Sequence, residues 1–232
     1  MGRNYSFLLF GRREYLPQLL RAVAAMAAPP QAEERLLLLD GQQIAVTVDA
    51  TADKNPAQLQ LDTGSSVQLT TWLNFELSGP TDPAERFIRE HWADFNQELL
   101  AAGRFRFSLW IEITLSETRY ELGLISPLSS GSMIFSFSPG LQATVQSLLT
   151  CGAAFGLFDS EQDTFKLIPF QPAPLAQWHN LHLSFQEEDL ILHSDRSGSL
   201  DPCIAMLKQK IQALPDSARF LPSESSAPGE AG

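Results

Sequence analysis

Apolar and polar residues follow two patterns along this chain, one with a period of two and one with a period near 3.6. Short apolar runs rich in β-branched and aromatic residues predict strands over residues 5–10, 35–39, 43–48, 58–61, 67–77, 104–115, 119–125, 133–137, 153–158, 164–168, 181–185 and 190–193. Apolar residues three or four positions apart predict helices over about 14–28, 83–100, 139–149 and 202–214.

The order of these elements suggests a repeated topology. A strand, a helix and two further strands follow one another about three times before residue 168. Neighbouring strands are joined by short turns, of which Asp40-Gly41 is a strong hairpin signal. We therefore expect an α+β fold: antiparallel sheet built from about three successive β-α-β-β units, with helices packed on one face and a C-terminal helix.

Two helix starts stand out. Asp82 can accept hydrogen bonds from free N–H groups, Pro83 suits the first helical position, and Glu85 lies where a capping box places its acid. Asp201 is expected to cap the last helix in the same way.

The domain organisation follows from the same pattern. Residues 1–214 are expected to form one domain, with the loop at 127–131 as the candidate sub-domain boundary. Residues 215–232 are rich in Ser, Pro and Gly and are expected to be a disordered tail.

Composition narrows the classes of function. The chain has 232 residues with 27 acidic and 16 basic side chains, a net charge of -11 that disfavours nucleic-acid binding. Its 2 cysteines are too few for a disulfide framework or a four-cysteine zinc site. No apolar run approaches the roughly 20 residues that span a bilayer. We expect a soluble, cytoplasmic protein without a cofactor and without membrane contact.

A first catalytic candidate is Asp62. The run Leu61-Asp62-Thr63-Gly64-Ser65-Ser66 resembles the active-site turn of pepsin-like and retroviral aspartic proteases. That resemblance implies a carboxylate that shares a proton with a twin and activates water. The chain has one such loop, so a two-loop active site requires a dimer. The alternative interpretation is an ordinary hairpin turn rich in Asp, Gly and Ser, with no catalytic role.

The histidines are the second candidate. His179 and His182 are three residues apart and His193 follows on the next predicted strand, so three imidazoles can in principle hold a zinc ion. In a strand, however, residues three apart face opposite sides. The competing interpretation makes His182 and His193 a cross-strand polar pair on a solvated face.

Acidic residues gather in the C-terminal part and suggest a surface for a basic partner. They occupy two predicted turns: Asp159, Glu161, Asp163, Glu187, Glu188 and Asp189. Trp110 faces away from Phe107 and Ile111 by strand alternation, and becomes an interaction patch if no helix covers that side. Ordinary solvated turns are the alternative.

Three hypotheses follow. The first is a non-catalytic protein-binding protein that occludes or scaffolds a partner, as immunity proteins, antitoxins and adaptors do. The second is a hydrolase, metal-dependent through the three histidines or aspartic through Asp62. The third is a peripheral subunit of an assembly. The first ranks highest because the sequence lacks a converging set of reactive groups, and the sequence leaves the oligomeric state open.

Overall fold

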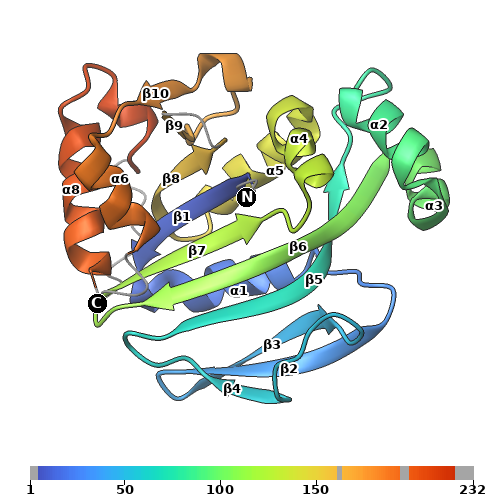
Figure 1. Cartoon of the computed structure of the whole chain (residues 1–232), viewed down its shortest axis with the longest axis horizontal. Coiled ribbons are helices and arrows are strands. Elements are labelled where there is room, and N and C mark those ends of the chain that lie inside the picture. The colour runs from blue at the N-terminus through green and yellow to red at the C-terminus, as the bar shows by residue number, and fades with distance from the viewer. Residues whose placement is uncertain (1–4, 161–163, 194–198, 223–232) are drawn as a thin grey trace, which may run out of the picture.

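A computed structural model describes residues 5–160, 164–193 and 199–222 of the chain (Figure 1). Its strands are β1 Ser6–Arg12, β2 Ala32–Leu39, β3 Gln42–Asp49, β4 Gln58–Gln60, β5 Ser66–Glu76, β6 Arg104–Leu115, β7 Arg119–Ile125, β8 Ala153–Asp159, β9 Phe165–Leu167 and β10 His179–Leu181. Its α-helices are α1 Leu16–Ala24, α2 Pro83–His91, α3 Gln97–Ala101, α4 Ser129–Phe137, α5 Pro139–Leu149, α6 Phe185–Leu192 and α8 Leu200–Gln212. Short 3-10 turns lie at Arg13–Tyr15, Ala93–Phe95, Leu175–Gln177 and Ser217–Arg219.

The strands form two sheets. The larger is a 7-stranded antiparallel sheet in the order β10-β9-β8-β1-β7-β6-β5, and the smaller is a 3-stranded mixed sheet in the order β3-β2-β4. β1 pairs with both β7 and β8, so the strands before and after residues 127–131 belong to one sheet. The predicted α+β class with antiparallel sheet and a C-terminal helix is confirmed at this level.

The large sheet has a hydrophobic core on each of its two faces. On one face, Phe7 and Leu9 of β1 pack in a core with α1, α5 and the inner side of the small sheet. On the other face, Leu8 and Phe10 pack in a second core with α6 and α8. We call these faces the α1 side and the α8 side. Because β1 is covered on both sides, all its residues from Ser6 to Gly11 are buried, and the alternation of an amphipathic strand is absent.

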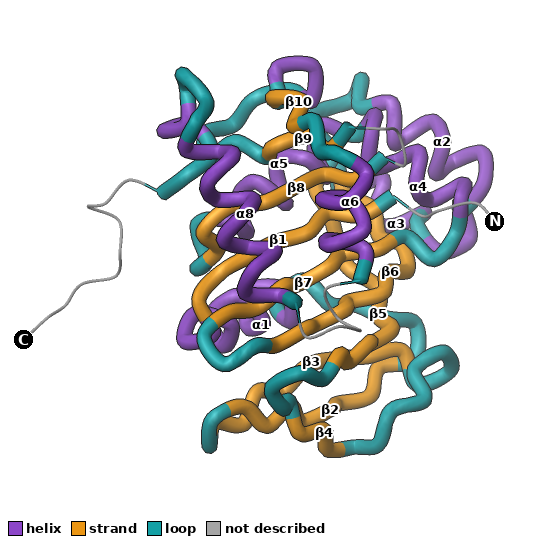
Figure 2. The backbone as a smooth tube through the Cα atoms, turned by 60° about the vertical axis from the view of Figure 1, so that its left-hand side comes forward, coloured by secondary structure: helices purple, strands orange, loops and turns teal. Residues whose placement is uncertain are grey.

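The prediction that helices cover only one face is therefore wrong. Figure 2 shows α6 and α8 lying across the sheet over β8 and β1, opposite α1 and α5. Sequence patterns did not indicate this arrangement, because these two helices come from the C-terminal part of the chain and fold back over the first strand.

The predicted strand at 133–137 is also wrong, because these residues end helix α4. A five-residue apolar run does not by itself distinguish a strand from a buried helical turn. Here Ile134 and Phe135 are buried, and the ring of Phe135 stacks on Phe7 with centroids 4.8 Å apart. The third β-α-β-β unit is thus replaced by two helices, α4 and α5, followed by the hairpin β8–β9.

The predicted hairpin at 181–193 is replaced by the short strand β10 and helix α6. Its physical reason is a capping box: Ser184 accepts a hydrogen bond from the backbone N–H of Glu187, whose carboxylate accepts from the backbone N–H of Ser184 at 2.6 Å. The acidic residues at 187–189 therefore lie on a helix and not in a turn.

The helix start at Asp82 is confirmed. Its side chain accepts from Ala84 N at 2.9 Å and, with its other oxygen, from Ser78 N at 3.0 Å and Gly140 N at 3.3 Å. The buried carboxylate thus lies between the N-termini of α2 and α5. The helix predicted over 83–100 is interrupted at His91 and continues as α3.

The described residues after α8 remain packed against the fold. Residues 215–222, assigned from sequence to a disordered tail, contain the 3-10 turn Ser217–Arg219, and Phe220 is fully buried. The rest of the predicted tail, 223–232, lies outside the described residues. Asp201 does not cap α8 as predicted: it lies in the first turn, after the N-cap residue Ser199.

Candidate functional site

The helices that the structure describes cover only part of the α8 side of the large sheet. α6 and α8 lie over β1, β8 and β9, and no helix in the described part of the chain lies over β5 and β6 on that side (Figures 1 and 2). Strand register identifies the side chains on this surface, which we call the open half-face: Thr70, Trp72, Ser108, Trp110, Glu112 and Ile125.

Trp110 lies at the centre of the open half-face. Along β6, Phe107, Leu109 and Ile111 are buried, and Trp110 is half-buried on the opposite side, as strand alternation predicts. It is paired with Ile125 on β7 and with Thr70 on β5. Neither core cluster includes Trp110, so its ring lies outside the two hydrophobic cores.

Trp72 extends the apolar surface. Trp72 pairs with Ser108, two residues before Trp110, so the two indoles are diagonal neighbours on one face. Together with Ile125 they form an apolar row across three strands. The indole N–H of Trp72 donates to Asp49 Oδ2 at 2.7 Å, which fixes this ring.

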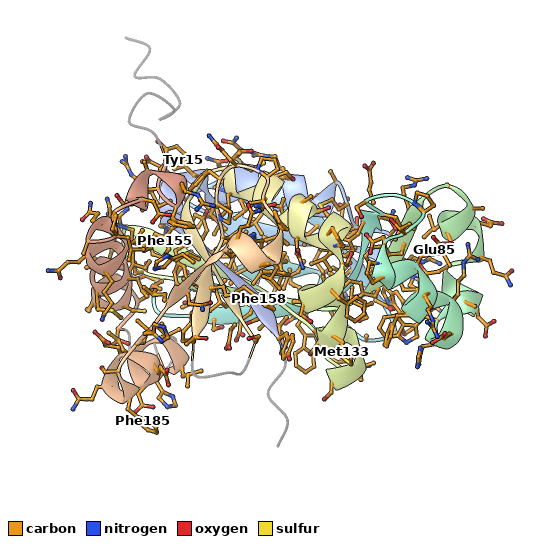
Figure 3. All side chains as sticks on the ribbon, turned by 90° about the horizontal axis from the view of Figure 1, so that it is seen from above. Tyr15, Glu85, Met133, Phe155, Phe158 and Phe185 are labelled. Atoms are coloured by element: carbon orange, nitrogen blue, oxygen red, sulfur yellow. The ribbon has the colours of Figure 1, made fainter. Side chains whose placement is uncertain are left out.

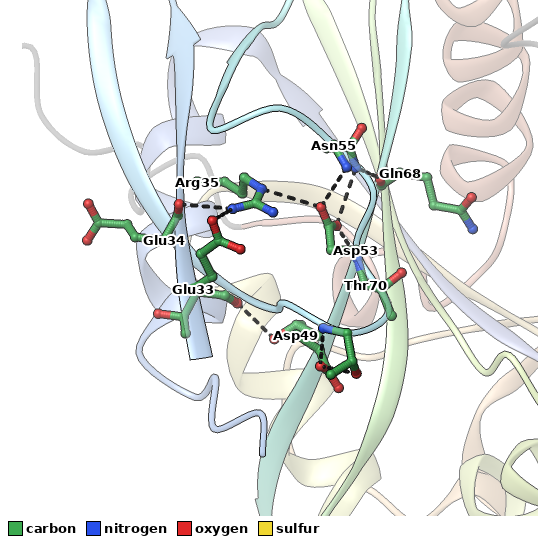
Figure 4. A network of polar contacts seen from close by, with 11 residues as sticks. Glu33, Glu34, Arg35, Asp49, Asp53, Asn55, Gln68 and Thr70 are labelled. Atoms are coloured by element: carbon green, nitrogen blue, oxygen red, sulfur yellow. Dashed lines mark hydrogen bonds and ion pairs between the residues drawn. The ribbon is translucent and has the colours of Figure 1, made fainter. Parts of the chain in front are cut away.

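A buried polar network links the two sheets (Figure 4), and its member Asp49 is the residue that binds the indole of Trp72. Asp49 also accepts from Thr51, at 3.0 Å from its N–H and 2.7 Å from its hydroxyl. Burial acts to raise the pKa of Asp49, but these hydrogen bonds and that of Trp72 outweigh it and hold the pKa below its ordinary value of 3.8. Asp49 is therefore a charged anchor for the edge strand β5.

Asp53 supplies the second link of this network. Its side chain is 0% exposed, lies 3.5 Å from Arg35 Nε, and accepts from Thr70 N at 2.9 Å. Asn55 donates to Asp53 and, at 2.6 Å, to the carbonyl of Gln68. These contacts occupy backbone groups on the outer edge of β5, where Ala28 N also donates to Trp72 O. The outer edge of β5, whose backbone groups could otherwise pair with another strand, is thus partly occupied.

The exposed side of α6 forms a second apolar and acidic surface. Phe185 is 83% exposed and Leu192 is 42% exposed, one heptad apart. Glu188 and Asp189 lie between them on the same helical face. We call Phe185, Glu188, Asp189 and Leu192 the α6 stripe. Figure 3 shows Phe185 projecting from the edge of the molecule.

The predicted acidic residues are only partly brought together. Glu187 is engaged in the fold, because it completes the capping box and pairs with Lys210 at 2.9 Å. The hydrogen bond to Ser184 N and then the Lys210 ammonium lower its pKa. Asp159 is the last residue of β8, where it pairs with Ser6 of β1. It therefore lies on a different element from the α6 stripe. Glu161 and Asp163 lie outside the described residues.

The three histidines do not form a metal-binding group. His179 lies on β10 with its ring 5.9 Å from that of Phe220, His182 is exposed, and His193 caps the C-terminal end of α6. Among the described residues, no three His, Cys, Asp or Glu side chains lie close enough to hold a metal ion. The alternative cross-strand pair of His182 and His193 is also wrong, because neither residue lies on a strand: His182 follows β10, and His193 is the C-cap residue of α6.

Asp62 lies in an exposed turn. Its carbonyl accepts from Ser65 Oγ at 2.5 Å, and Gly64 has a φ of 77°, as a turn glycine requires. Thr63 Oγ1 accepts from Arg13 at 2.6 Å. Arg13 also binds Asp40 through two nitrogens, so the motif that resembles a protease loop is part of a contact between turns.

Sequence analysis identified Trp110 but missed its neighbours. The sequence patterns predict strands at Phe185 and Leu192, which is wrong. The overlooked signal is the Ser184-x-x-Glu187 capping box, which starts a helix and so places both residues on one helical face. Trp72 and Ile125 become part of the surface only through the strand register, which sequence alone does not give.

Comparison of this chain with protein-family models, with curated proteins and with solved structures found no match. Within the described ranges, none of the helices combines the length and apolar character needed to cross a bilayer.

Proposed function

We propose that this chain is a non-catalytic protein-binding protein that occludes or scaffolds its partner through the open half-face and the α6 stripe. The observation that carries the proposal is the placement of Trp110 on a sheet face that the described helices leave uncovered. Tryptophans and other aromatic residues supply much of the binding energy of protein interfaces.

The partner is expected to be basic, with apolar side chains that contact the indoles. Glu188 and Asp189 flank two exposed apolar residues on the α6 stripe, and the whole chain carries a net charge of -11. Opposite charge at the rim of an interface accelerates association and excludes like-charged proteins. The partner therefore combines a basic rim with an apolar centre.

A photo-reactive amino acid at Ser108 tests this proposal in the source cell. Ser108 lies on the open half-face, and a matched probe at Gln43 lies on the exposed side of β3. We expect the Ser108 probe to form a defined adduct with one protein that the Gln43 probe does not form, and Trp110→Ala to abolish that adduct. Equal adducts at both positions, or none at Ser108, contradict the proposal.

The adduct partner is then purified and its binding measured directly. We expect complex formation to weaken as salt rises, and Glu188→Gln with Asp189→Asn to slow association. An affinity that does not depend on salt contradicts the basic character of the partner. The contact at Trp110 is tested separately, by Trp110→Ala.

A further inference from the structure

A polar groove lies along α8, away from the open half-face, with which it shares no residue. Its volume is about 430 Å³, within the range of small-molecule sites. The turn before β7 and one side of α8 line it: Thr118, Arg119, Asp201, Ile204, Ala205, Lys208, Gln209 and Gln212. Ile204 and Ala205 supply a small apolar surface, and the remaining lining side chains are polar.

Asp201 is held in a fixed orientation at one end of the groove. Its Oδ1 accepts from Ser116 Oγ at 2.8 Å and from Thr118 Oγ1 at 3.3 Å. Two hydroxyl donors on one oxygen offset part of the carboxylate charge. No described residue donates to Oδ2, which can accept a hydroxyl group from a ligand.

Two cations of the groove have no acidic partner among the described residues. Arg12 pairs with Glu14 and Arg13 pairs with Asp40, each at 2.8 Å. Arg119 and Lys208, in contrast, form no ion pair with any residue in the described part of the chain, although acids outnumber bases by 27 to 16.

The position of Arg119 makes it suited to bind an oxyanion. It is the first residue of β7 and is half-buried, so its side chain has less freedom to lose than a fully exposed arginine. A guanidinium presents a planar fork of N–H donors that matches phosphate oxygens, and an ammonium adds a second positive charge.

We propose that this groove binds a small phosphate monoester that carries hydroxyl groups. Arg119 and Lys208 bind the phosphate dianion, and Asp201 Oδ2 accepts a hydroxyl of the organic part. Gln209 and Gln212 offer further donors and acceptors along the same side of α8.

Amide chemical shifts of isotope-labelled protein, titrated with glycerol 3-phosphate at constant ionic strength, test the site. We expect saturable shifts at residues 118, 119 and 208, with glycerol 3-phosphate binding at least about tenfold tighter than inorganic phosphate because it adds hydroxyl contacts. Glycerol alone is expected to give no shifts. Equal affinity for inorganic phosphate overturns the ester part of the proposal.

Variants decide whether the two cations form the site. Arg119→Gln and Lys208→Gln are each expected to weaken binding at least about tenfold. Arg104→Gln is the matched control: Arg104 is exposed at the far end of β6 and forms no ion pair with any described residue, so this variant is expected to leave the binding affinity unchanged. Lys208 is exposed, so its variant is not expected to disturb folding. Shifts that do not saturate, or that persist in both variants, overturn the proposal.

Discussion

Truncating Trp110 to alanine should cost far less stability than truncating Phe107, three residues earlier on the same strand. Phe107 is 3% exposed on the α1 side, with ring centroids 5.3 Å from Phe75 and 5.8 Å from Phe135. Removing such a ring leaves a cavity, and Phe107→Ala should cost about 4 kcal/mol.

Trp110 is surrounded differently. Its removal leaves no enclosed cavity, because Trp110 lies outside both cores on a face that no described helix covers. Its loss removes strand preference of about 1 kcal/mol and cross-strand contacts with Thr70 and Ile125 of about 0.2–1 kcal/mol. Trp110→Ala should therefore cost roughly 1–2 kcal/mol, about half the Phe107 value or less.

Urea unfolding of the wild type and both variants measures this difference in the free energy of unfolding. The comparison uses one slope of that free energy against urea concentration for all three proteins. A Trp110→Ala cost equal to that of Phe107→Ala would refute the reasoning, because it would mean that Trp110 is packed as a core residue and is not held ready for a partner.

Three further predictions concern the network and the thiols. Asp53→Asn should destabilise the protein by about 3 kcal/mol in urea unfolding, since it breaks a buried ion pair with Arg35; a cost no larger than that of Glu33→Gln would contradict this. The pKa of Asp49 is lowered, so its stabilisation is present above its unfolded value of 3.8 and is lost as the pH falls below about 4; urea midpoints at acid pH should fall less in Asp49→Asn than in the wild type. Burial, and then the charge of Glu121, raise the pKa of Cys203 to about 12, and Cys151 is half-exposed. Mass spectrometry should therefore find a thiol reagent on Cys151 alone in the folded protein, and labelling of Cys203 without unfolding would contradict its burial.

Local signals in the sequence predicted local structure well. Asp40 and Gly41 both have positive φ, 51° and 78°, as the predicted hairpin requires, and Asp82 caps α2. The strand predicted over 104–115 is observed as β6. These features depend on residues that are adjacent in the chain, so propensity and capping chemistry determine them.

Features set by distant contacts were not predicted. Residues 133–137 form a helix because Phe135 packs on Phe7, far away in sequence. Whether Trp110 is covered depends on where α6 and α8 settle, and these helices occupy the β1 half of the face. Strand alternation predicted the direction of Trp110, but only the sheet order brings Trp72 and Ile125 beside it.

Affinity for the protein captured at Ser108, measured by calorimetry with the wild type, Trp110→Ala and Gln43→Ala, tests the central claim most directly. If the open half-face is the docking surface, Trp110→Ala lowers the affinity by about thirtyfold or more, which is the effect of an interface hot spot. Gln43→Ala leaves the affinity unchanged. A Trp110→Ala affinity within about twofold of the wild type would contradict the claim, since that is well below a hot-spot effect.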